Sequence, residues 1–220
     1  MDMDKIKDFS KTYLRQEKSG HDWLHIQRVV ANCEQIIKYI QEPINVDVVL
    51  AAAYTHDLLD EKIKVDYLLT EKDVRHILKE AQMSLEEIEQ VLSIIKNLSF
   101  AANLIEKQHL TLEGQIVQDA DRLDAIGAIG IARTFYYGGS KGHSLYDPKA
   151  VHTSAQAVCS KETYRQVRNV RQHFDDKLLK LKNLMNTKAG QEMAKNRHQL
   201  MIDFLQAFDQ ETLSNTNQLS

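Results

Sequence analysis

The chain has 220 residues, 43% of them hydrophobic and 27% charged, which is enough for one domain with a substantial core. Its formal net charge of −3 lacks the strongly basic balance of a nucleic-acid-binding protein. Eight glycines and two prolines fall well below the usual share of about 12%, which disfavours turn-rich β folds.

The N-terminal part of the chain is predicted to be helical, because apolar residues recur every three or four positions. The predicted helices cover residues 2–17, 24–40, 45–59, 70–81 and 84–98. The third is apolar nearly all round, with Asn45 as its N-cap, and is expected to be central and buried. Thr70 opens the fourth helix, and a capping box at Ser84 opens the fifth.

The rest of the chain is predicted to contain longer elements. These are an aperiodic stretch at 99–110, a helix at 112–135, a mobile loop at 136–152, helices at 161–185 and 189–212, and a frayed tail at 214–220. Gly127 and Gly130 lie inside the first of these helices, and we attribute them to close approach of a neighbouring helix. The seven to eight helices predict a single all-α domain over residues 1–213, with a site core at about 20–135 and C-terminal helices at about 155–213.

The chain shows no pattern of a membrane or secreted protein. The apolar run from Val48 to Tyr54 is far short of the roughly 20 residues of a membrane span. The start at Met1 lacks the basic region of a signal peptide. The two cysteines, Cys33 and Cys159, form no paired motif. We therefore expect a soluble protein of the reducing cytoplasm, without a membrane partner.

Two ionisable residues, His56 and Asp57, end the predicted central helix. Unpaired charge is costly to bury, so these side chains require partners. Imidazole nitrogen and carboxylate oxygen together suit Mn²⁺, Fe²⁺, Zn²⁺ or a similar ion, provided that further ligands converge from other helices. Candidates occur upstream in residues 21–29 and downstream in residues 118–125, which gives the order H, HD, D along the chain.

The surroundings of these residues carry a family resemblance. The segments read GHDWLHIQRV, AAYTHDLLDEK and DADRLDAIGAIGIARTF. They resemble the signature of the HD-domain metal-dependent phosphohydrolase superfamily, an all-α fold. With HFDDKLLKLKNLMNT they are similar to its bacterial YedJ/YpgQ-like subgroup over roughly residues 20–205. The resemblance implies that one divalent cation, Mn²⁺ foremost and otherwise Mg²⁺, Ni²⁺, Fe²⁺ or Zn²⁺, is bound by His25, His56, Asp57 and Asp121.

The same resemblance implies roles for residues beside the ligands. Asp60 is expected to take the proton of the attacking water, and Arg122 to contact phosphate. Residues expected to support the ligands or the substrate are His21, Asp22, Glu61, Lys62 and Asp124. Additional positive charge for a polyphosphate is expected from Arg133, Lys141, His143 and Lys177.

The expected function is hydrolysis of a small-molecule nucleotide by metal-activated water, foremost of a nucleoside triphosphate to monophosphate and pyrophosphate. A nucleoside monophosphate phosphatase and a phosphodiesterase of the same fold are alternatives, as is a catalytically idle nucleotide-binding module. The segment GGSKG lacks the GxxxxGK[ST] spacing of a phosphate loop, and no HExxH motif occurs. The expected assembly is a monomer or a homodimer.

Overall fold

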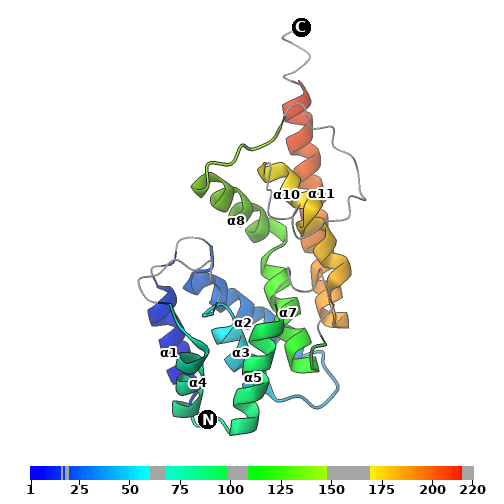
Figure 1. The fold of residues 1–220 in the computed structure, drawn as a ribbon. Coiled ribbons are helices and arrows are strands. Elements are labelled where there is room, and N and C mark those ends of the chain that lie inside the picture. The colour runs from blue at the N-terminus through cyan, green and yellow to red at the C-terminus, as the bar shows by residue number, and fades with distance from the viewer. Residues whose placement is uncertain (16, 18–19, 60–67, 99–108, 148–168, 215–220) are drawn as a thin grey trace. The chain divides into compact units, whose positions relative to one another are not determined.

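The structure is a computed structural model, and it describes residues 1–15, 17, 20–59, 68–98, 109–147 and 169–214. These residues form nine α-helices and one 3₁₀-helix with no strand among them (Figure 1), which confirms the all-α class. None of the described helices is long and apolar enough to cross a membrane. The chain groups into two compact units, residues 1–124 and 125–220, and the single domain over residues 1–213 stays a prediction.

The first unit is built around one apolar helix. Its helices are α1 (Met3–Leu14), α2 (Trp23–Ile37), α3 (Val46–Thr55), α4 (Glu71–Glu80), α5 (Leu85–Asn97) and α7 (Leu112–Asp124). The central helix α3 packs against α1, α2, α5 and α7, and Val48, Val49 and Ala51 are fully buried. This confirms the predicted central position of that segment.

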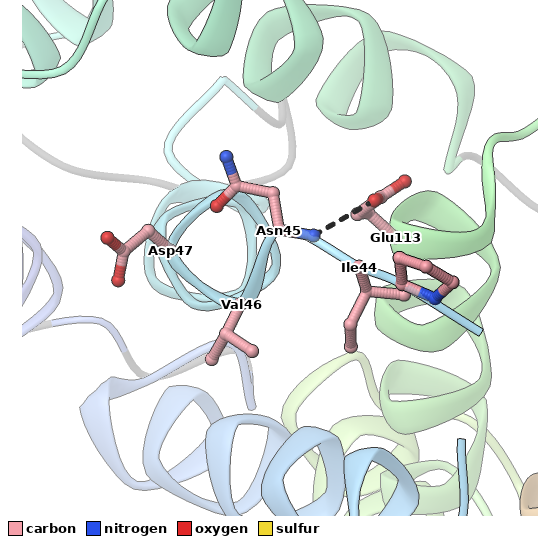
Figure 2. Close-up of a pocket in the computed structure, with 6 residues that line it drawn as sticks. Ile44, Asn45, Val46, Asp47 and Glu113 are labelled. Atoms are coloured by element: carbon pink, nitrogen blue, oxygen red, sulfur yellow. Dashed lines mark hydrogen bonds between the residues drawn. The ribbon is translucent and has the colours of Figure 1, made fainter. Parts of the chain in front are cut away.

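The predicted helix starts are confirmed by their hydrogen bonds. The side chain of Asn45 accepts a hydrogen bond from the backbone N–H of Val48 at 3.2 Å. At the start of α5, the side chains of Ser84 and Glu87 form the reciprocal bonds of a capping box. Figure 2 shows the start of α3, where the backbone N–H of Asn45 donates to Glu113 Oε1 at 3.2 Å. This bond ties the first residues of α3 to the first turn of α7.

The long helix predicted at 112–135 is in fact two helices. It is interrupted after Asp124, and α8 (Gly127–Ser140) follows. Gly127 has a backbone φ of +76°, a conformation that residues other than glycine rarely adopt. A Cβ on Gly130 would lie 2.3 Å from the carbonyl oxygen of Ala125. Gly130 therefore accommodates the turn of its own chain, and the attribution of this glycine to a neighbouring helix was wrong.

The predicted loop and the next predicted helix also differ from the structure. Residues 136–140 belong to α8, because packing of α8 against α10 and α11 offsets the cost of glycine in a helix. In the described part of the helix predicted at 161–185, residues 169–185, the chain forms α10 (Val170–Asp176) followed by the 3₁₀-helix η1 (Leu178–Leu184). The segment 148–168 and the tail from residue 215 lie outside the described residues.

The second unit has an aromatic core. Its elements α8, α10 and η1 pack with α11 (Lys188–Ser214). The rings of Phe135, Phe174, Phe204 and Phe208 contact one another, with centroid separations of 5.7 to 6.2 Å. Beside them, the Arg171 guanidinium donates through Nε and Nη2 to the two carboxylate oxygens of Asp209, both at 2.8 Å. This two-point bond joins α10 to α11.

Candidate metal centre

Three helices of the first unit bring the four predicted ligands together. His25 lies in the first turn of α2, and His56 and Asp57 directly follow the end of α3. Asp121 lies in the last turn of α7. Because α2, α3 and α7 all pack against one another, residues far apart in the sequence meet at one place.

The ligand atoms are spaced as they would be around one ion. His25 Nε2 lies 3.3 Å from His56 Nε2, 3.3 Å from Asp57 Oδ2 and 3.5 Å from Asp121 Oδ1. His56 Nε2 lies 3.4 Å from Asp57 Oδ1 and 3.9 Å from Asp121 Oδ1. Ligands bound at about 2.0–2.2 Å are separated by about 3.0–3.5 Å in tetrahedral or octahedral geometry. A single divalent cation therefore fits among these atoms.

The hydrogen bonds of the two imidazoles fix which nitrogen faces the cluster. His25 Nδ1 lies 2.7 Å from Asp124 Oδ2, and His56 Nδ1 lies 2.9 Å from the carbonyl oxygen of Ala53. A carboxylate and a carbonyl only accept hydrogen bonds, so each Nδ1 carries the proton and donates. In the neutral imidazole, which is the form of histidine that binds a metal, each Nε2 then presents a lone pair to the cluster.

The cluster as a whole is an assembly of acceptors. The Nε2 atoms of the two imidazoles lie 3.3 Å apart, and carboxylate oxygens of Asp57 and Asp121 lie within 3.9 Å of them. Such groups repel one another unless positive charge lies among them. A cation bound by these four side chains supplies that charge, so the donor set fits a divalent metal ion.

Asp57 is held in its ionised form. Burial raises the pKa of its carboxyl group. When the imidazoles beside it are protonated, before a cation binds, the charges of His56 and His21, together with hydrogen bonds from His21 and His25, outweigh burial and hold the pKa well below its usual range. The Nδ1 atom of His21 lies 2.9 Å from Asp57 Oδ2. An ionised carboxylate is the form that binds a metal ion.

The cluster opens to solvent on one side. The side chain of His25 is fully buried, and those of His56 and Asp57 are 4% and 10% exposed. By contrast, the Asp121 side chain is 40% exposed and that of His21 is 27% exposed. Solvent therefore reaches the cluster from the side of Asp121 and His21.

The structure also places three predicted supporting residues at the cluster. His21 lies against Asp57, and its backbone N–H donates to Glu17 Oε2 at 3.0 Å. Asp22 is the N-cap of α2, since its Oδ1 accepts from the backbone N–H of His25 at 2.9 Å. Asp124 accepts the hydrogen bond from the His25 ring. These contacts fix the side chain and the backbone of His25.

Other predicted residues are not brought to the cluster by the described structure. Asp60, Glu61 and Lys62 lie outside the described residues. Arg122 is only 9% exposed, and burial lowers the pKa of its guanidinium against the opposite effects of Asp119 and Asp121. The remaining cations belong to the second unit, and their role at the site stays a prediction: Arg133, Lys141, His143 and Lys177.

Two residues beside the cluster were not assigned a role from the sequence. Arg28 donates to Asp124 from Nε at 2.6 Å and from Nη2 at 3.1 Å. The Asn32 amide donates to the carbonyl oxygen of Ala120 at 3.0 Å. Both stand on α2 at helical spacing from His25, and that spacing is the signal that could have identified them.

A pocket in the same unit is separate from the cluster. The residues around it include Ile44, Asn45, Asp47 and Glu113 (Figure 2), at the N-terminal ends of α3 and α7. Three of the four candidate ligands, His56, Asp57 and Asp121, lie at the C-terminal ends of these same helices. A helix of the length of α7 extends about 20 Å, so the pocket is not part of the metal centre.

Comparison with known proteins agrees with this geometry. The chain matches the family described as HD domain over residues 23–126, a range that includes all four candidate ligands. It is 37% identical to YpgQ of Bacillus subtilis over 211 residues, which cover 94% of this chain and 92% of YpgQ. The similarity therefore extends over nearly the whole of both proteins.

Solved structures show the same fold. A crystal structure of a protein from Lactobacillus plantarum has a TM-score of 0.82 and 35% identity, covering 96% of this chain and 97% of its own. YpgQ in complex with ADP gives a TM-score of 0.75 at 33% identity over the structural alignment, covering 95% and 94% of the two chains. An HD-superfamily hydrolase from Bacillus thuringiensis gives a TM-score of 0.70 at 39% identity, and the alignment covers 95% of each chain.

Proposed function

The chain belongs to the HD domain superfamily of metal-dependent hydrolases, and on this premise we propose that it hydrolyses phosphate bonds of small-molecule nucleotides. In the reaction that we favour, water attacks the α-phosphorus of a nucleoside triphosphate. The bond from that phosphorus to the bridging oxygen breaks, and the products are a nucleoside monophosphate and pyrophosphate.

One observation carries the proposal. Acceptor atoms of His56, Asp57 and Asp121 lie within 3.5 Å of His25 Nε2. The Nδ1 atoms of His25 and His56 are hydrogen-bonded to Asp124 and to the carbonyl of Ala53. A merely structural hydrogen-bonded cluster would alternate donors with acceptors. The arrangement supports a bound divalent cation, with Mn²⁺ as our first choice.

Bound at this place, a divalent cation would make a water nucleophilic at neutral pH and would draw electron density from a phosphoryl oxygen. The chain holds His25 and His56 in one orientation and leaves the side of Asp121 open for the substrate. We retain Asp60 as the group that takes the proton of the water. We also retain Arg122 as a phosphate contact, which requires that a phosphate reach it beside Asp121.

Nucleotides are the proposed substrates because a similar protein binds one. YpgQ was crystallised with ADP, and the similarity covers 95% of this chain. The cations of the second unit are proposed to contribute to binding of the polyphosphate: Arg133, Lys141, His143 and Lys177. Action on monophosphates or cyclic nucleotides, and binding without turnover, are the competing outcomes of the test. A cytoplasmic location and a monomeric or homodimeric state remain predictions.

The test is a screen of metal-stripped protein reloaded with Mn²⁺, Mg²⁺, Ni²⁺ or Zn²⁺. Ribo- and deoxyribonucleoside mono- and triphosphates and cyclic nucleotides are incubated with it, and the products are separated by anion exchange. We expect monophosphate plus pyrophosphate, with the rate reduced about 1000-fold or more in Asp57→Asn because a cation ligand is lost. Orthophosphate alone would indicate a phosphatase, and linearised cyclic nucleotide a phosphodiesterase.

A matched control separates loss of the ligand from loss of the fold. Asp47 stands on the exposed first turn of α3, at the opposite end of this helix from His56. Asp47→Asn should therefore keep full activity. If Asp57→Asn also retained wild-type turnover in the preferred metal, the proposed centre would be wrong. Stabilisation by nucleotide without turnover in any metal would point to a binding module.

A further inference from the structure

Arg28 has no part in the proposed reaction, yet it is tied to a candidate ligand through one carboxylate. It lies on α2, three residues after His25, and reaches Asp124 at the end of α7. We propose that Arg28 is a positioning residue that holds the Asp124 carboxylate in the orientation that directs His25 Nε2 at the cation. This inference rests on the proposed metal centre.

The geometry leaves Asp124 little freedom. Its Oδ1 accepts from Arg28 Nε at 2.6 Å, and its Oδ2 accepts from Arg28 Nη2 at 3.1 Å and from His25 Nδ1 at 2.7 Å. Two parallel bonds from a planar guanidinium fix both the plane and the rotation of a carboxylate. Since the Asp124 side chain is only 3% exposed, water cannot readily replace these bonds. Arg28 thus sets the position of the atom to which the His25 ring donates.

The orientation of the His25 ring matters because its two nitrogens have different tasks. Nδ1 donates to Asp124, and Nε2 must present its lone pair within 3.3 to 3.5 Å of the other ligand atoms. If the Asp124 carboxylate rotates, the ring can turn with it or exchange its proton to Nε2. Either change weakens the cation site without removing any ligand.

A purely structural role for Arg28 is the competing explanation. The helices that Arg28 joins are held by other contacts as well, because α2 packs along α7 and Asn32 donates to the carbonyl of Ala120. The Arg28 side chain is itself one-third exposed. The main effect of its removal is therefore expected on the affinity for the cation rather than on the fold.

The experiment measures Mn²⁺ binding to the full-length, metal-stripped protein by calorimetry, and compares Co²⁺ absorption spectra. The variants are Arg28→Gln, Arg28→Lys, Asp124→Asn and the double variant Arg28→Gln with Asp124→Asn. Arg28→Gln should bind Mn²⁺ about 10- to 100-fold more weakly and change the Co²⁺ spectrum. Arg28→Lys keeps the positive charge but cannot donate two parallel hydrogen bonds, so it should recover part of the affinity.

The double variant tests whether Arg28 acts through Asp124. If it does, the double variant should bind no more weakly than Asp124→Asn alone, because the two losses are not additive. Arg171→Gln is the matched control, since Arg171 makes the same two-point bond to Asp209 in the second unit. That variant should keep wild-type Mn²⁺ affinity.

Several outcomes would overturn the inference. Unchanged Mn²⁺ affinity and Co²⁺ spectrum in Arg28→Gln, with only a lower melting temperature, would leave Arg28 a structural role. Additive losses in the double variant would show that Arg28 acts by another route. If Arg28→Gln does not fold, Arg28→Lys decides by the same two measurements. Failure of the wild-type protein to bind any divalent cation would instead reject the metal centre itself, and the role of Arg28 with it.

Discussion

The two units of the chain bury different kinds of side chain. Beside its apolar core, the first unit buries the imidazole of His25 and the carboxylates of Asp57 and Asp124. The core of the second unit contains a cluster of phenyl rings that includes the fully buried Phe174. The core of the second unit is therefore stabilised mainly by apolar burial, whereas the first unit contains a cluster of acceptor groups that added positive charge would stabilise.

The same kind of bidentate Arg–Asp interaction has a different role in each of the two units. The pair of hydrogen bonds from Arg171 to Asp209 joins two helices. In the pair from Arg28 to Asp124, the carboxylate also accepts a hydrogen bond from the candidate metal ligand His25. A buried ion pair by itself is weak evidence of function, because its desolvation opposes its attraction. What distinguishes the pair in the first unit is the third group that the carboxylate binds.

The largest expected effect is a loss of stability that is confined to the second unit. Phe174→Ala removes a fully buried ring from the aromatic cluster and should lower the free energy of unfolding by about 3–5 kcal/mol. Urea denaturation of the metal-stripped protein measures this loss. Mn²⁺ affinity should stay within about twofold of wild type at temperatures where the variant is folded. A large loss of affinity would show that the two cores are not independent.

The next effect should be confined to the first unit. Mn²⁺ at about 100 times its dissociation constant should add about 2.7 kcal/mol to the stability of the region that binds it. Hydrogen exchange should become slower in α2, α3 and α7, and His56→Ala should abolish the change. Equal slowing in α10 and α11 would contradict the contrast between the two units.

A third prediction concerns pH and the second unit. Burial, followed by the charges of Lys177 and His143, lowers the pKa of His173 to about 4. The folded state therefore binds fewer protons than the unfolded state between pH 4 and 6.5, so the contribution of His173 is complete above pH 6.5. As the pH falls from 6.5 towards 4, stability should decrease by about 2 kcal/mol, since partial exposure of the ring reduces the full effect.

The pH prediction is checked by comparing wild type with His173→Gln, which cannot titrate. Urea denaturation of the metal-stripped proteins at pH 7.5, 6.0 and 4.5 gives the slope for each. The variant should lose less stability on acidification than wild type. Parallel slopes would mean that His173 has the same pKa in the folded and unfolded protein.

The smallest expected effect concerns the end of α3 that lies away from the cluster. Asn45→Ala removes the N-cap of α3 and the hydrogen bond from the Asn45 amide to Glu87. The loss of stability should be about 1 kcal/mol, with hydrolysis and Mn²⁺ affinity unchanged. Thermal denaturation together with the activity assay measures both. A fall in turnover comparable to that of Asp57→Asn would show that both ends of the helix serve the site.

The features that the sequence predicted are those that local chemistry determines. Asn45 and Ser84 marked helix starts because their side chains bond to backbone a few residues away. The pair His56 and Asp57 was visible because charged residues follow directly on an apolar helix. Its partners His25 and Asp121 could be proposed only through the family resemblance, and the structure then brought the four together.

The features that escaped prediction depend on contacts between distant residues. The bond between Arg28 and Asp124 spans 96 positions, and helical periodicity does not specify which side chains meet across two helices. The break after Asp124 depends on the φ of Gly127 and on the carbonyl of Ala125 beside Gly130. In the sequence, both glycines looked like tolerable interruptions of one helix.

The break after Asp124 has an electrostatic consequence for the cluster. Because α7 stops there, Asp121 lies in its last turn, and α3 likewise stops at Thr55, just before His56. The C-terminus of an α-helix carries a partial negative charge of about half an electron, from aligned peptide dipoles. Two such helix ends meet at the candidate ligands, while α2 begins there with Asp22 capping its positive end. The backbone itself thus attracts a cation to this place, in addition to the charge of the carboxylates.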